Sequence, residues 1–89
     1  MTTQSEHALP LSAWLDLLAR ELPAGSAQPT AAEQAAILDL ARVAAHASER
    51  IAAPISAFLV GVALASHAPE DRAVALRTLV EHLENQTGA

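Results

Sequence analysis

The 89-residue chain contains no cysteine, no lysine and no tyrosine, and its aromatic side chains are limited to Trp14 and Phe58. The absence of cysteine excludes a disulfide framework, thiolate catalysis and cysteine-based metal sites. The chain has five arginines and ten Asp and Glu residues, so its formal net charge is −5, and it has no cluster of positive charge. Nucleic acids and anionic lipids are bound through such clusters. The composition therefore predicts no nucleic-acid partner, and the length fits a single domain of residues 1–89.

Signals for export or membrane insertion are also missing. The first ten residues are polar and lack a basic region and an apolar core, so a cytoplasmic location is expected. The segment between Arg50 and Glu70 is uncharged and includes a continuous apolar run. Pro54 and Pro69 limit a helix there to about 14 residues, fewer than the about 20 that cross a bilayer. The sequence therefore predicts a buried helix and no membrane span.

Apolar residues that recur every three or four positions predict helices, and no stretch alternates with the period of two typical of a strand. Four helices are expected at about 11–22, 31–51, 54–67 and 69–85, with frayed ends at 1–9 and 86–89. Thr30 and Glu33 form a capping-box pattern, and Pro69 opens the last helix. The first helix carries Trp14 on its apolar face, where we expect a core residue; a partly exposed interface anchor is the alternative.

The third expected helix is apolar on nearly all sides, which is typical of a helix at the centre of a domain. Ala57, Gly61 and Ala65 form a stripe of small residues, which we interpret as a site of close packing within the chain. The predicted fold is all-α, a compact four-helix bundle-like domain with a central apolar third helix. Alanine supplies almost half of the apolar residues, so the area that the core can bury is limited. A homodimer, in which a second copy covers the remaining apolar surface, is therefore an open alternative to a monomer.

Familiar catalytic signatures are missing, including a glycine-rich phosphate loop, a nucleophile elbow and an H-E-x-x-H motif. We therefore expect no enzyme, no cofactor and no metal. The best candidate binding residues are polar side chains of the second helix at steps of three and four: Asp39, Arg42, His46, Glu49 and Arg50. Two interpretations stay open. One is a solvated face with weak ion pairs; the other is a strip in which the two arginines bind a phosphate or carboxylate, with the histidine between them.

Several segments together resemble the core of a small helical family of high-GC bacteria. The similar segments are Asp39 to His46, Glu49-Arg50, Ala52 to Ile55 and Phe58 to Gly61, preceded by Trp14-Leu15. The resemblance covers about residues 11–84. Members of this domain family of unknown function occur alone or associated with molybdenum-cofactor guanylyltransferases.

The resemblance implies no catalytic residues, and the chain lacks the nucleotide loop and the strand–helix alternation of those enzymes. It implies a non-enzymatic accessory or protein-interaction module, with a molybdenum-cofactor nucleotidyltransferase as the partner. The alternative from a different class is a small helical domain that binds an anionic ligand through the polar residues of the second helix.

Overall fold

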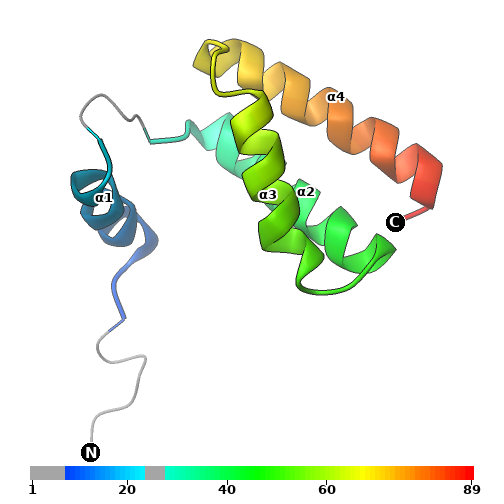
Figure 1. The fold of residues 1–89 in the computed structure, drawn as a ribbon, viewed down its shortest axis with the longest axis horizontal. Helices are drawn as coiled ribbons and strands as arrows, with labels where there is room; N and C mark the ends of the chain where they lie inside the picture. Colours follow the sequence, from blue (N-terminus) through cyan, green and yellow to red (C-terminus); the bar gives the residue numbers. More distant parts are fainter. Residues whose placement is uncertain (1–7, 24–27) are drawn as a thin grey trace, which may run out of the picture.

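The computed structural model describes residues 8–23 and 28–89, and in these ranges the chain forms four α-helices and no strand (Figure 1). The helices are α1 (Leu11–Glu21), α2 (Ala31–Ala47), α3 (Ala52–Ala63) and α4 (Pro69–Thr87). The all-α prediction is confirmed for this part of the chain. The frayed end expected at 1–9 lies largely outside the described residues.

The starts of α2 and α4 agree with their sequence signals. The backbone N–H of Glu33 donates to Thr30 Oγ1 at 3.1 Å, and Glu33 Oε1 accepts from the backbone N–H of Thr30 at 2.9 Å. This reciprocal pair satisfies two amides that have no partner inside the helix. Pro69 is the first residue of α4, where a missing N–H costs little, and Glu70 and Asp71 follow in the first turn.

The end of the second helix and both ends of the third differ from the predicted boundaries. The second helix ends at Ala47 instead of 51, and the chain turns before Ala52, whose N–H donates to Glu49 O at 2.9 Å. Because the first amides of a helix need no intrahelical partner, α3 begins two residues before Pro54 rather than at it. It ends at Ala63 instead of 67.

The last helix is longer than predicted and continues through Thr87. Gly88 adopts a left-handed conformation (φ 74°), and its N–H donates to Glu84 O at 2.8 Å. Glycine reaches this conformation without the steric penalty of a side chain, so it ends the helix with a satisfied carbonyl. Residues 86 and 87 are therefore helical, and the frayed end predicted from 86 is wrong there.

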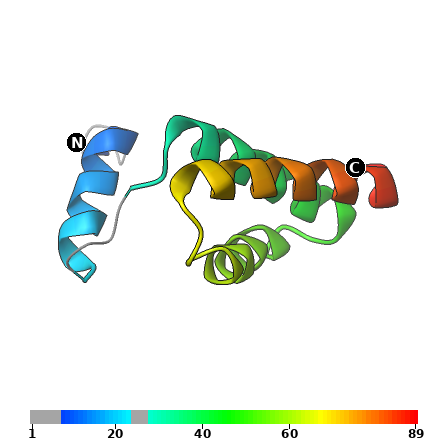
Figure 2. The same cartoon turned by 90° about the horizontal axis from the view of Figure 1, so that it is seen from above.

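The centre of the fold is α2, not the third helix. Both α3 and α4 pack against α2, and within the described residues α3 and α4 make no helix–helix contact with each other (Figures 1 and 2). The buried apolar residues come from α2 and α4: Ala36, Leu40, Val43, Leu76 and Val80. No residue of α3, a helix described over its whole length, is fully buried. The prediction of a central third helix is therefore wrong: α2 carries small and medium apolar side chains on two faces and can accept two neighbours.

The helices α2 and α4 run side by side in the same direction, with α3 crossing on one side of the pair (Figure 2). Residues joined across the pair are about equally far apart in sequence, as in Glu33 with Arg72 and Asp39 with Arg77. A nearly constant offset of this kind is expected when two packed helices run in the same direction. The third helix thus serves as the crossover that returns the chain to the starting end of α2.

The first helix stands apart from the other three (Figures 1 and 2). Over the residues that the structure describes, α1 makes no helix–helix contact, and it buries no residue. Trp14 is 49% exposed, so its predicted place in the core is wrong; an apolar helix face without a neighbour has nothing to be buried against. No helix in the described ranges is long and apolar enough to span a bilayer.

Candidate functional site

The outer side of α3 carries a continuous row of exposed apolar side chains. They recur at helical spacing and are 56% to 71% exposed: Ile51, which precedes the first residue of α3, and Ile55, Phe58, Leu59 and Val62 within it. We call these five residues the α3 face. At about 150–250 Å² for a large side chain, they expose on the order of 600 Å². A patch of that size is at the upper end for a monomer and typically marks an interaction site.

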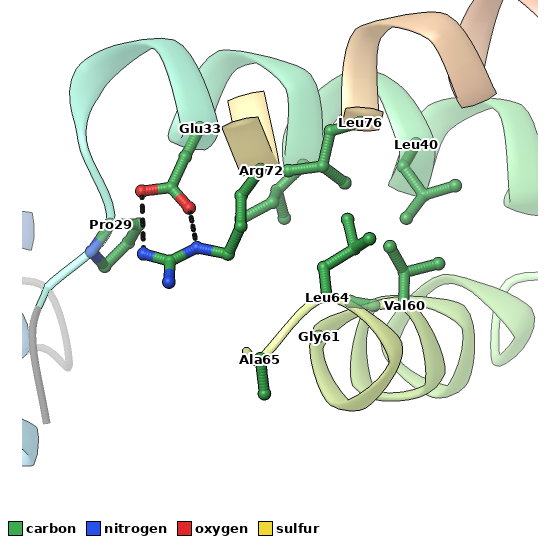
Figure 3. Close-up of a pocket in the computed structure, with 11 residues that line it drawn as sticks. Pro29, Glu33, Leu40, Val60, Gly61, Leu64, Ala65, Arg72 and Leu76 are labelled. Atoms are coloured by element: carbon green, nitrogen blue, oxygen red, sulfur yellow. Dashed lines mark hydrogen bonds and ion pairs between the residues drawn. The ribbon is translucent and has the colours of Figure 1, made fainter. Parts of the chain in front are cut away.

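A groove of about 480 Å³ lies beside the α3 face, between α3 and the first halves of α2 and α4 (Figure 3). Its apolar lining comes from all three helices and the end of α3 and includes Ile37, Leu40, Val60, Leu64 and Leu76, with Ala57 and Gly61 on α3 and Ala65 just after it. We call it the Gly61 groove. A Cβ atom added to Gly61 would meet nothing within 4 Å. The predicted close packing within the chain is therefore wrong at Gly61, the middle residue of the stripe.

One end of the Gly61 groove is closed by an ion pair between α2 and α4 (Figure 3). Arg72 Nε donates to Glu33 Oε2 at 2.5 Å, and Arg72 Nη1 donates to the backbone carbonyl of His67 at 3.0 Å. Only 3% of Glu33 is exposed. The hydrogen bond from Arg72 is the main reason why the pKa of Glu33 lies below its usual value of 4.5, and the same contact raises the pKa of Arg72. The pair neutralises both charges, so the groove offers no free charge at this end.

Sequence reasoning assigned Glu33 to the capping box and missed its pairing with Arg72. Both residues lie in the first turns of their helices, at corresponding positions. A parallel arrangement of α2 and α4 would have placed them together, but the spacing of apolar residues carries no information on the relative direction of two helices.

The predicted polar residues of the second helix do not form one strip. Asp39 accepts from Arg77 Nη1 at 2.7 Å, and Arg42 Nη2 donates to Glu84 Oε2 at 2.5 Å while its Nε lies 3.9 Å from Asp39. Arg77, and to a smaller extent Arg42, hold the pKa of Asp39 below its usual range. Asp39 and Arg42 thus join α2 to α4 at the surface.

The other predicted members lie apart from that network. His46 is exposed in the last turn of α2, whereas Glu49 and Arg50 belong to the turn before α3. The structure therefore does not bring Arg42 and Arg50 together as two free guanidinium groups. Anion binding by these residues stays a prediction, and the contacts of Arg42 match the interpretation as a surface with weak ion pairs.

The first helix presents a second uncovered apolar surface. Its apolar side chains at helical spacing are 39% to 61% exposed: Leu11, Trp14, Leu18 and Leu22. We call these four residues the α1 face. Asp16 and Arg20 lie on the opposite side of the helix. Helices shorter than about 12–15 residues are marginal in water without tertiary contacts, and α1 has 11 residues and buries none of them.

The described residues include no group of three or more His, Asp or Glu side chains able to hold a metal ion. Comparison with curated proteins and with solved structures finds no match to the chain. A family model described as "Domain of unknown function (DUF6457)" matches residues 6–88. That match spans all four helices, both apolar faces and the Gly61 groove. The chain belongs to this domain family of unknown function.

Proposed function

We propose that this domain is a non-enzymatic protein-interaction module whose docking surface consists of the α3 face, the Gly61 groove and the α1 face. The observation that carries the proposal is the α3 face, where five large apolar side chains are more than half exposed. The chain has no charged side chain between Arg50 and Glu70, so this face also lacks charges of its own. Extended apolar surfaces of this kind favour association, because covering them releases water from apolar area.

The shape of the Gly61 groove favours a helical segment over a small ligand. Small-molecule sites combine an apolar lining with a few free polar groups that fix the orientation of the ligand. Here Glu33 and Arg72 are the charged side chains of the lining, and they bind each other. A groove with a small-residue wall and an apolar floor instead suits an amphipathic helix, which inserts side chains at positions three and four apart.

The resemblance of the sequence suggests the first partner to test. That resemblance implies an association with molybdenum-cofactor guanylyltransferases, so we take such an enzyme from the same organism as the candidate. In this proposal the domain assists molybdenum-cofactor biosynthesis by binding the enzyme through its apolar surface and contributes no catalytic group.

Calorimetric titration of the purified guanylyltransferase with the domain tests the proposal. The informative variant is Phe58→Glu, which introduces a charge into the α3 face at a residue that is 71% exposed. The matched control is Val74→Glu, which adds the same charge to an apolar residue of α4 that is 67% exposed. We expect Phe58→Glu to weaken binding by at least about tenfold and Val74→Glu to leave it within about twofold.

Affinity capture from the native organism extends the test to other partners. Proteins retained by the wild-type domain and by Val74→Glu, but lost with Phe58→Glu, would support a docking role of the α3 face. The proposal is wrong if the three forms retain the same proteins and if, in addition, the wild-type chain does not associate with itself.

A further inference from the structure

We infer that a second copy of this chain covers the docking surface, with the α1 face of each copy lying in the Gly61 groove and against the α3 face of the other. The inference rests on the proposed function, because it names a partner for the same surface. Its basis is the presence, in one chain, of two uncovered apolar surfaces: the apolar face of a helix that stands apart and a groove with small residues on one wall.

Gln28, which precedes α2, contacts α1 on its polar side. Gln28 Nε2 donates to Asp16 Oδ1 at 2.5 Å. Asp16 lies on the side of α1 opposite to Trp14, so this contact leaves the α1 face uncovered. In the described residues no Cα atom of α1 lies within 8 Å of a Cα atom of α2, α3 or α4. The α1 face is thus presented to another molecule.

The area of the two surfaces agrees with the size of a stable interface. The α3 face exposes on the order of 600 Å², less than the about 800 Å² that each partner buries in a standard complex. The four residues of the α1 face add on the order of 400 Å². Together they reach the required area, whereas the α3 face alone does not. An exchange of α1 between two copies therefore explains why both surfaces are present.

The charge distribution favours a second copy. A chain with a net charge of −5 repels another copy of itself wherever acidic groups meet. A symmetric interface brings identical patches close together, so it must avoid such groups. The α3 face is free of charged side chains, and the charged end of the Gly61 groove is neutralised by the pair of Glu33 and Arg72.

The test combines sedimentation equilibrium with the emission of Trp14, the sole tryptophan, in the full chain over a range of micromolar concentrations. We expect a species of twice the 9.2 kDa chain mass and a blue shift of the emission, because Trp14 leaves water when α1 docks. Both signals should follow the same dilution curve, since docking on a second copy depends on concentration.

Two pairs of variants assign the interface. Phe58→Glu in the α3 face and Leu18→Glu in the α1 face should each raise the dissociation constant of the dimer by at least about tenfold. The controls are Val74→Glu on α4 and Ser12→Glu on the polar side of α1, which should change it by less than about twofold. Circular dichroism of each variant at low concentration shows whether the helices of the monomer remain folded.

The outcomes separate this inference from the proposed function. A monomer with blue-shifted emission at every concentration would mean that α1 docks onto its own chain. A monomer with unshifted emission would also overturn the inference. The proposed function would then be tested by the calorimetric titration of the guanylyltransferase with Phe58→Glu. A dimer that survives Leu18→Glu but not Phe58→Glu would show that the copies associate through α3 without exchanging α1.

Discussion

Glu33 has two roles at the start of α2, since it accepts a hydrogen bond from Thr30 and forms the ion pair with Arg72. Glutamine retains the capping role but lacks the charge. We expect Glu33→Gln to lower the free energy of unfolding by about 1–3 kcal/mol, because Arg72 loses its carboxylate partner. Glu33→Ala should cost about 0.5–2 kcal/mol more, because the cap is lost as well. Urea denaturation at neutral pH measures both losses, and an unchanged Glu33→Gln would show that the ion pair contributes nothing.

The same residue predicts a sensitivity to acid. Because the pKa of Glu33 is lowered in the folded state, the unfolded chain takes up a proton more readily as the pH falls. The stabilisation from the pair is present above the usual pKa of 4.5 and is lost as the pH falls through the lower folded value. The pKa of Asp39, lowered by Arg77, acts in the same direction. Thermal melts from neutral to acidic pH should show a larger loss of Tm for the wild type than for Glu33→Gln; parallel curves would contradict this assignment.

Arg42 and Arg50 separate the two interpretations of the polar residues predicted for the second helix. Arg42 binds Glu84 and Asp39 at the surface, so we expect the double variant Arg42→Ala, Arg50→Ala to lose less than about 1 kcal/mol of stability. Since the guanidinium group of Arg42 is engaged, inorganic phosphate should bind no better to the wild type than to the double variant. Calorimetry at low and moderate salt checks this. Phosphate binding that disappears in the double variant would instead support the anion-binding function.

At the scale of elements, Gly61 distinguishes an open groove from a packed helix contact. No atom lies within 4 Å of a Cβ built at this position, so Gly61→Leu should stabilise α3 by about 0.5–1 kcal/mol through its better helix propensity. Close packing, as expected from the sequence, would cost about 1–3 kcal/mol instead. The new side chain fills the groove and should also abolish the concentration-dependent shift of Trp14 emission. Urea denaturation is done in a Phe58→Glu background, so that self-association does not contribute, and fluorescence in the otherwise unchanged chain. Ala35→Leu, at an exposed site on α2, is the control in both measurements.

The starts of α2 and α4 could be predicted because each has a local signal: Thr30 with Glu33, and Pro69 with two following acids. The end of α2 could not, because the turn before Ala52 depends on backbone hydrogen bonds that no residue type signals. The central helix was also predicted wrongly. Apolar content alone favoured α3, but the fully buried apolar residues belong to α2 and α4, among them Ala36 and Val43.

The candidate site was predictable only in part. Both the apolar side of the first helix and the uncharged segment around Phe58 were visible in the sequence. Their exposure to solvent could not be predicted, because the spacing of apolar residues identifies an apolar helix face but not what packs against it. The Gly61 groove depends on the direction in which α3 crosses α2 and α4, which is a property of the assembled fold.

At the scale of the whole molecule, two leucines test where the core lies. Leu40 is 2% exposed between α2 and its neighbours, whereas Leu59 is 62% exposed on the α3 face. We expect Leu40→Ala to cost about 2–5 kcal/mol and Leu59→Ala less than about 1 kcal/mol. Both changes belong in a Phe58→Glu background, so that self-association does not contribute to urea denaturation. Equal losses of stability in the two variants would contradict the assignment of α2, rather than α3, as the central helix.

The parallel arrangement of α2 and α4 has a consequence for the order of folding. Their ion pairs join residues 38 to 42 positions apart, so the core forms only after the chain has closed a long loop through α3. Closing such a loop costs chain entropy before any core contact compensates for it. The helices themselves form faster, from local contacts. Refolding should therefore show early helix formation followed by a slower docking of α4 onto α2, and removal of the Leu40 side chain should delay the second step.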